Sequence, residues 1–317
     1  MTAVLGLDIG GSTTRAVRAE DGRCVAEARA GSANIRSVGA AEAGRQLDAV
    51  LAGIRTDDVA AVCAGAAGAD SAPGRAALTE LLAKRLPGAA GGDSAPARAA
   101  LGELLAQRLP GAVVQIVHDA RLILAAADLD AGIAVIAGTG SAGWGRTLDG
   151  REARAGGFGY LIGDEGSGYW TAREAVRHVL HRADTGAAPD PLGAALLAAC
   201  GVAAPVNLFD LFYARPERAF WAGHAGVVAR LAASDPVAAE ILGRAADALA
   251  SLAATVGARL DSTGPVVLGG GFAVHEPALR AAVAARLVAA GLPDVRVIPR
   301  DPVEGAVRLA RRLLETA

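Results

Sequence analysis

The chain contains a single lysine, Lys84, among 31 basic residues. A Walker phosphate loop needs a lysine beside its glycines, and Lys84 is far from any glycine run, so that class of nucleotide site is excluded. The three cysteines, Cys24, Cys63 and Cys200, are odd in number and far apart. This pattern fits a reducing compartment and leaves no pair spaced for a metal or an iron–sulfur cluster.

Charge and hydropathy exclude further classes of protein. The formal net charge is −2 and no basic stripe is present, so we expect no nucleic-acid partner. No stretch of about 20 apolar residues lacks a charge, and the N-terminus enters an apolar strand without a signal-peptide pattern. We therefore expect a cytoplasmic protein without a membrane span. A length of 317 residues suits two domains, with cores built mostly of Ala, Val and Leu because aromatics make up only 3%.

Residues 4–18 predict a strand, a glycine turn and a second strand. The apolar run Val4–Ile9 contains one carboxylate, Asp8, and ends at Gly10-Gly11. Asp21-Gly22, further on, is typical of a tight hairpin turn. Because no helix follows the glycines, this is not a dinucleotide-binding fingerprint. Backbone N–H groups and hydroxyls of such a turn can surround a phosphate, although a hairpin without a ligand fits this segment alone equally well.

A second segment repeats this pattern. Residues 134–141 form an apolar run that ends in Gly-Thr-Gly-Ser, and Asp149-Gly150 follows. Nine positions separate Ser12 from Asp21, and eight separate Ser141 from Asp149. Two matching hairpins predict two domains of similar topology with phosphates between them.

Residues 65–87 recur as residues 88–110, with 19 of 23 positions identical. Each copy has a helical Leu/Ala stripe bounded by a Ser cap and a Pro-Gly stop. Two copies are too few for a solenoid. We interpret the second copy as a recent tandem duplication that adds one surface helix.

Three later segments place polar or glycine residues at the ends of apolar strands. Asp119 follows a strand at 113–117 and occupies the predicted N-cap of a helix at 120–128; capping alone would explain it, but open α/β sheets also bind ligands at this edge. Gly156–Tyr160 and Gly163–Ser167 predict a packed loop that carries Asp164 into a cleft, because the apolar residues Phe158, Tyr160, Leu161 and Ile162 do not suit a flexible linker. Residues 266–272 predict a buried strand that ends in three glycines.

Together these motifs resemble the actin-like ATPase and sugar kinase superfamily, in particular the branch of N-acetylglucosamine kinases and BadF/BadG-type ATPases. The matching segments are LDIGGST (7–13), GSAN (31–34), HDA (118–120), AGTGS (137–141), GGFGY (156–160), GDEGS (163–167) and LGGG (268–271). They occur in the family's order and span most of the chain.

The resemblance implies an α/β fold of two actin-like ATPase (ribonuclease H-like) domains with a deep interdomain cleft. The domains would be residues 1–129, with a C-terminal helix at 303–317 packing back, and residues 130–302. It also implies a homodimer.

The activity implied is that of an ATP-dependent kinase for the 6-hydroxyl of N-acetylglucosamine or a related amino sugar such as glucosamine. Asp119 would be the catalytic base, and Asp8 would hold Mg²⁺ through water. The residues implied at ATP are Asp8, Gly10, Gly11, Ser12, Thr13, Gly138, Thr139, Gly140, Ser141, Gly269, Gly270 and Gly271. Those implied at the sugar are Asn34, Asp119, Gly157, Phe158 and Asp164, and Phe158 stands where family members often have tryptophan.

Two other functions share this fold. One is an activator ATPase that drives electron transfer to a dehydratase and binds an iron–sulfur cluster through paired cysteines, which Cys24, Cys63 and Cys200 do not supply. The other is a sugar- or nucleotide-binding regulator without turnover, against which the intact Asp8, Asp119 and Asp164 argue. The related branch with a structural zinc is disfavoured because its cysteine cluster is missing.

Overall fold

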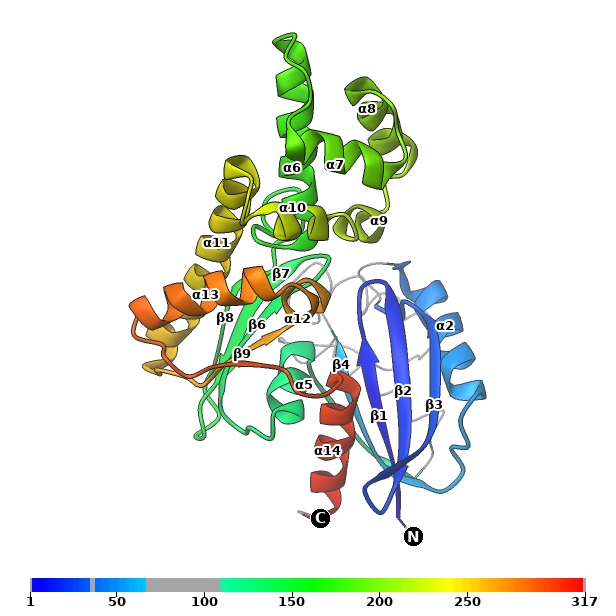
Figure 1. Cartoon of the computed structure of the whole chain (residues 1–317). Helices are drawn as coiled ribbons and strands as arrows, with labels where there is room; N and C mark the ends of the chain where they lie inside the picture. The colour runs from blue at the N-terminus through cyan, green and yellow to red at the C-terminus, as the bar shows by residue number, and fades with distance from the viewer. Residues whose placement is uncertain (1, 35–37, 67–108, 110, 316–317) are drawn as a thin grey trace. The chain divides into compact units, whose positions relative to one another are not determined.

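The computed structural model describes residues 2–34, 38–66, 109 and 111–315 (Figure 1). The chain divides into two compact units: Met1–Asp130 with Ile298–Ala317 form unit 1, and Ala131–Val297 form unit 2. The tandem repeat at 65–110 lies almost wholly outside the described residues, so the interpretation of its second copy stays a prediction.

Unit 1 is built on a five-stranded sheet in the order β3-β2-β1-β4-β5. The strands are β1 (Ala3–Ile9), β2 (Thr13–Glu20), β3 (Arg23–Gly31), β4 (Val59–Ala66) and β5 (Val113–His118). The first three form an antiparallel meander, whereas β4 and β5 run parallel to β1. The hairpin turn predicted at Asp21-Gly22 is confirmed, because both residues have the positive φ (49° and 85°) that a type I′ turn requires.

Helices cover both faces of this sheet. They are α2 (Ala40–Ala52) on one face and α5 (Asp119–Ala126) with α14 (Pro302–Glu315) on the other. Leu5 of β1 faces α2, and Val4 faces α14. α14 can approach β1 closely because position 6 is glycine: a Cβ there would lie 2.7 Å from the Val307 backbone nitrogen. Since side chains alternate along a strand, Asp8 shares the face of Gly6, on which α5 also lies.

Unit 2 repeats this sheet topology with the order β10-β9-β6-β7-β8. The strands are β6 (Gly132–Ala137), β7 (Ser141–Arg146), β8 (Glu152–Gly156), β9 (Val266–Gly269) and β10 (Val295–Val297). Again the first three strands form an antiparallel meander, and β9 is parallel to the first of them. In both units the strands lie in the order third, second, first, fourth, fifth, which confirms the predicted fold class of two similar α/β halves.

The helices of unit 2 surround one apolar core. They are α6 (Gly168–Asp184), α7 (Pro191–Cys200), α8 (Pro205–Ala214), α9 (Arg218–Ala222), α10 (Ala225–Leu231), α11 (Pro236–Leu260), α12 (Gly271–His275) and α13 (Pro277–Ala289). Among the described helices, α11 is the one that is long and apolar enough to cross a membrane. The bent pair of α7 and α8 would be a second candidate if it were counted as one span. Ile241, Leu242 and Leu249 of α11 are buried in the core, which is the position of an internal helix.

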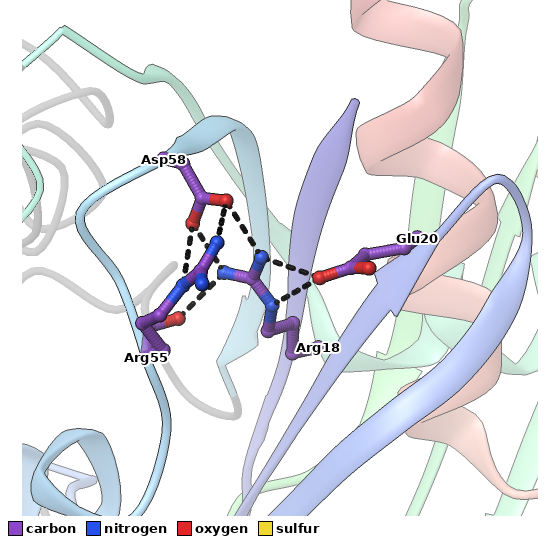
Figure 2. Close-up of polar contacts among 4 residues, drawn as sticks. All are labelled: Arg18, Glu20, Arg55 and Asp58. Carbon is purple, nitrogen blue, oxygen red and sulfur yellow. Dashed lines mark hydrogen bonds and ion pairs between the residues drawn. The ribbon is translucent and has the colours of Figure 1, made fainter. Parts of the chain in front are cut away.

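A cluster of four charged residues lies at the end of the unit 1 sheet where β1 begins (Figure 2). Arg18, whose side chain is only 3% exposed, donates to Asp58 Oδ1 (2.7 Å), to the Arg55 carbonyl (2.7 Å) and to Glu20 Oε1 (2.6 Å). Arg55 also pairs with Asp58. Because Glu20 is paired with the first residue of β1, the cluster lies at the opposite end of that strand from the glycine turn. It ties the segment before β4 to β2.

Candidate functional site

Asp8 is the one charged residue of β1 and lies near the carboxyl end of the strand. It is paired in the ladder with Arg15 of β2. Burial and repulsion by Asp119, only partly offset by Arg15, raise the pKa of Asp8 to about 7. A nearby cation would favour the charged form of such a carboxylate. Asp8 thus has the electrostatic character expected of a metal ligand.

The glycine turn after β1 is held by its own backbone and by the loop that carries Asn34. The Gly10 nitrogen donates to the Thr13 carbonyl (2.9 Å), and Ser32 Oγ donates to the Gly10 carbonyl (2.8 Å). The backbone nitrogen of Asn34 in turn donates to Ser32 Oγ (3.1 Å). Asn34 is buried, whereas residues 11–13 of the turn are exposed. Ser12 and Thr13 of the turn are therefore accessible to solvent.

Asp119 is the first residue of α5, so the N-cap is His118, one residue earlier than predicted. The reason is local: His118 has extended dihedral angles (φ −62°, ψ 138°), and helical geometry begins after it. His118 Nδ1 lies 2.8 Å from Asp119 Oδ1, to which the Ala120 nitrogen also donates (2.9 Å). Burial alone would raise the pKa of Asp119, but His118 and backbone N–H groups outweigh it and hold that pKa below its usual value.

The strand register brings Asp8 and Asp119 to the same edge of the unit 1 sheet. Gly65 of β4 pairs with Asp8, and the next residue, Ala66, pairs with His118 of β5. The edge is formed by the carboxyl ends of three parallel strands, where open α/β sheets bind ligands. Two neighbouring carboxylates with pKa values shifted in opposite directions are the pattern expected where a metal and a proton acceptor are needed.

In unit 2 the second glycine turn is anchored to the loop before α6. The Gly138 nitrogen donates to the Gly140 carbonyl (3.0 Å), and the Gly168 nitrogen donates to the Gly138 carbonyl (2.8 Å). Ser141 Oγ donates to the Glu165 carbonyl (2.7 Å). The predicted hairpin of unit 2 is therefore present, and it is joined to the second predicted motif of that unit.

The third glycine segment lies directly against this hairpin. Gly269 ends β9, Gly270 has φ 86°, and Gly271 opens α12. A Cβ on Gly270 would lie 2.6 Å from the Ala137 carbonyl oxygen and 2.8 Å from the Gly138 nitrogen. Only glycine permits both this φ and this approach. Unit 2 thus brings together the segments predicted to contact phosphate and adenosine.

Asp164 is buried and has a left-handed backbone (φ 63°). Its Oδ1 accepts from the Ser141 nitrogen (3.3 Å), and a Cβ on Gly140 would lie 2.9 Å from its Oδ2. Burial raises the pKa of Asp164, although the Ser141 N–H and the charge of Arg218 oppose the shift. Arg218 Nη1 lies 4.0 Å from Asp164 Oδ2.

The loop before Asp164 is less packed than predicted. Phe158, Leu161 and Ile162 are 63%, 79% and 79% exposed, and among the apolar side chains of this loop Tyr160 is the one that stacks, edge-on against Tyr169 at 5.5 Å. The expectation of a packed loop is wrong for the three exposed side chains. Left-handed glycines at positions 156, 157 and 159 turn the chain outward there. The Gly157 nitrogen still donates to the Ser141 carbonyl oxygen (3.2 Å), and this bond joins the loop to the hairpin.

The donor set fits magnesium better than a structural metal. Within the described parts of the chain, no group of three or more His, Cys, Asp or Glu side chains could hold an ion. Mg²⁺ does not need such a group, because it is usually bound by one or two carboxylates together with water and substrate phosphates. Asp8, with its raised pKa, would be the carboxylate of unit 1.

Comparison with protein families gives a match over most of the chain. The model of the BadF/BadG/BcrA/BcrD ATPase family matches residues 5–310. The chain belongs to this family. The match includes both glycine turns, Asp119 and Asp164.

Individual relatives of this BadF/BadG/BcrA/BcrD member include sugar kinases. An N-acetylmuramic acid/N-acetylglucosamine kinase of Clostridium acetobutylicum is 32% identical over 192 residues; the aligned part is 58% of this chain and 55%, about half, of that kinase. A solved candidate N-acetylglucosamine kinase of Porphyromonas gingivalis has a TM-score of 0.73 at 23% identity, covering 98% of this chain and 99% of that one. The corresponding protein of Chromobacterium violaceum has a TM-score of 0.70 at 24% identity with the same coverage. The two structures confirm the actin-like fold.

The cysteines of this family member do not suit an iron–sulfur cluster. All three are free. Burial raises the pKa of Cys63 to about 12 and that of Cys200 to about 11, so neither readily forms the thiolate that a cluster requires. The activator-ATPase alternative therefore lacks its ligands.

Sequence reasoning gave no role to three residues at these sites. Ser32 and His118 lie inside the quoted motifs GSAN and HDA, and their contacts with Gly10 and Asp119 could have been suspected from that position. Arg218 carried no sequence signal, because it is far from Asp164 along the chain and reaches it only through the packing of unit 2.

Proposed function

We propose that this protein is an ATP-dependent kinase that phosphorylates the 6-hydroxyl of N-acetylglucosamine or a related amino sugar. The observation that carries the proposal is the ionised Asp119, which shares the carboxyl edge of the unit 1 sheet with Asp8. Membership of the family and the kinase relative of Clostridium acetobutylicum support it.

Asp119 would accept the proton of the attacking sugar hydroxyl. Its lowered pKa makes it a weak base, but a loose phosphoryl-transfer transition state needs the proton to leave only late. His118 and the Ala120 nitrogen, both in contact with Oδ1, would keep the carboxylate in one orientation. Fixed orientation is a large part of what an enzyme contributes to a two-substrate reaction.

The phosphate and metal contacts would come from the turns and from Asp8. Asp8 would hold Mg²⁺ through water, and the ion would supply positive charge at the phosphates of ATP. Backbone N–H and hydroxyl groups of Gly10–Thr13 and Gly138–Ser141 would bind phosphate oxygens. The segment Gly269–Gly271, where the chain has no Cβ, would contact adenosine.

The sugar would be bound by Asn34, Gly157, Phe158 and Asp164. An amide offers both a donor and an acceptor, and a carboxylate offers acceptors, which suits vicinal hydroxyls. Glucosamine is a further candidate substrate. We also propose a cytoplasmic homodimer that binds neither nucleic acid nor membrane.

An ADP-release assay over a panel of sugars tests this function. The panel is N-acetylglucosamine, glucosamine, N-acetylmuramic acid and glucose, with Mg²⁺ present or chelated, and the product is located by phosphorus NMR. We expect Mg²⁺-dependent 6-phosphorylation of at least one amino sugar. If none of these sugars supports ADP release, the proposal is overturned. A brown, iron-containing preparation would instead support the activator ATPase.

A further inference from the structure

Arg218 approaches its carboxylate partner less closely than Arg177 and Arg244 of unit 2 approach theirs. Arg177 and Arg244 lie within 3.1 Å and 3.3 Å of Glu174 and form hydrogen bonds with it. Arg218 Nη1 is 4.0 Å from Asp164 Oδ2, which is beyond hydrogen-bond distance. Within the part of the chain that the structure describes, no hydrogen bond of its guanidinium is found. Its side chain is 37% exposed to solvent.

The surroundings hold this guanidinium in place. Its central carbon lies 5.1 Å from the centroid of the Tyr160 ring, and Tyr160 itself packs edge-on against Tyr169. A cation over an aromatic ring is attracted to the ring face. The arginine is therefore oriented before any ligand binds, which reduces the entropy lost on binding.

Asp164 approaches Arg218 without a hydrogen bond. Its Oδ1 accepts from the Ser141 nitrogen, and its Oδ2, which lies against Gly140, is the oxygen 4.0 Å from Arg218 Nη1. Arginine offers five N–H donors in a fork that matches a carboxylate in two places at once. An arginine that touches one carboxylate loosely can bind a second one from a ligand.

The loop that carries Tyr160 also carries two exposed apolar side chains, Phe158 and Leu161. The region thus combines an anchored cation with apolar surface, beside the residue proposed to bind the sugar. A neutral sugar offers this cation only uncharged oxygens, whereas an amino sugar with a short carboxylate-bearing substituent would add a charge-assisted contact and use the apolar surface as well.

We propose that Arg218 is a specificity residue that binds the carboxylate of an acidic amino sugar, so that the enzyme prefers N-acetylmuramic acid, with its lactyl ether, to N-acetylglucosamine. This inference rests on the proposed kinase function. The lactyl methyl group would contact Phe158 or Leu161. Asp119 serves both sugars alike, because the reacting 6-hydroxyl is the same.

The test compares kcat/KM for the two sugars in the wild type, Arg218→Ala, Arg218→Lys and Arg215→Ala. Arg215 is the matched control: it also lies over an aromatic ring, Phe220, at 4.4 Å, but its carboxylate partner is Glu217 at 3.2 Å. We expect Arg218→Ala to lower kcat/KM for N-acetylmuramic acid by roughly 10- to 100-fold, the range for a charge-assisted contact. The loss for N-acetylglucosamine should be clearly smaller, because that sugar feels only the charge removed from beside Asp164.

Arg218→Lys keeps the charge without the fork, so its loss for N-acetylmuramic acid should be intermediate, and Arg215→Ala should leave the ratio of the two sugars unchanged. Turnover of N-acetylglucosamine without turnover of N-acetylmuramic acid would overturn this inference and leave the kinase proposal standing. An equal loss for both sugars, or a raised KM for ATP, would assign Arg218 to folding or to the nucleotide and also overturn it. No turnover of either sugar would overturn the kinase proposal itself.

Discussion

The two glycine turns can be compared directly, because the sheets that carry them have the same strand order. With Gly10 aligned to Gly138, both turns close through a hydrogen bond from that glycine nitrogen, 2.9 Å in unit 1 and 3.0 Å in unit 2. The position of Asp8 in β1 corresponds to Ile136 in β6. Unit 2 obtains a carboxylate in another way, since Asp164 reaches its turn from a loop.

Because of this difference, the carboxylates at the two turns have neighbours of opposite charge. In unit 1 the strand carboxylate faces a second one, Asp119, and its pKa rises to about 7. In unit 2 the loop carboxylate lies near Arg218, whose charge opposes the rise that burial causes. The first arrangement suits a cation and a proton acceptor, whereas the second suits anionic groups of ligands. Under the proposals above, the same sheet topology would serve two chemistries, because the carboxylate comes from the strand in unit 1 and from a loop in unit 2.

Among the variants of the two turns, Asp119→Asn is expected to have the largest effect on activity. Removing the proton acceptor from the unit 1 edge should lower kcat by at least ~100-fold, the usual scale for a general base. The sugar KM should change much less. Steady-state kinetics measures this, with Asp128→Asn as control, since Asp128 is an exposed residue paired with Arg300. Turnover close to the wild-type rate would show that the base is elsewhere.

Asp8→Asn tests whether the strand carboxylate of unit 1, which has no counterpart in β6 of unit 2, holds Mg²⁺. The variant should lower kcat by about 10- to 100-fold and raise the Mg²⁺ concentration needed for half-maximal rate, as expected for a ligand that holds a metal through water. A Mg²⁺ titration of the rate measures this. Ile136→Val, at the corresponding position of β6, should change neither quantity. An unaltered Mg²⁺ requirement in Asp8→Asn would remove Asp8 from the metal site.

Gly270→Ala should destabilise unit 2 far more than Gly138→Ala. At position 270 the new Cβ would lie 2.6 Å from backbone atoms at a φ of 86°, whereas at position 138 its nearest neighbour would be 3.7 Å away. We expect a loss of about 2 kcal/mol or more in the free energy of unfolding for Gly270→Ala, and little for Gly138→Ala. Urea unfolding of both variants measures the difference, and equal losses would contradict the close packing of the two segments.

The smallest effect is expected for Asp58→Asn, at the far end of the unit 1 sheet. Hydrogen bonds from Arg18 and Arg55 hold the pKa of Asp58 well below its usual value. A depressed pKa contributes stability above the unfolded value of about 4, and that contribution is lost as the pH falls further. The variant should therefore melt a few degrees lower than the wild type at pH 7, and the gap should narrow below pH ~4.

Asp57→Asn, which alters the exposed neighbour of Asp58, provides the control for these melting curves. Kinetic constants should be unchanged in both variants, because the cluster lies away from Asp8. A gap between Asp58→Asn and the wild type that does not depend on pH would show that the ion pairs contribute nothing.

Much of the fold could be predicted from local patterns. The alternation after Gly11, the Asp21-Gly22 turn and the apolar run at 266–269 predict elements that the structure contains. The helix at 191–200 and the short strand at 295–297 were missed. Their segments are short or rich in Ala, Gly and Pro, so their conformation depends on the neighbours against which they pack.

The candidate site was predicted unevenly. Asp8 and Asp119 could be singled out because each is a carboxylate at the end of an apolar strand. The cap at His118 could not, because the start of a helix depends on dihedral angles that His118 and Asp119 could both adopt. The outward position of Leu161 was also missed, since an apolar residue carries no mark of whether a partner will cover it.

Local sequence patterns were enough to predict the two glycine turns, the repeated strand–turn–strand pattern and the resemblance to the family, because turn chemistry and apolar periodicity act over a few neighbouring residues. Tertiary structure alone decided which charges meet. Gly65 and Ala66 bring Asp8 and His118 to one edge through strand register, and the packing of α9 brings Arg218 to Asp164. The pKa of a carboxylate depends on burial and on charges a few ångströms away, and neither is encoded in sequence distance.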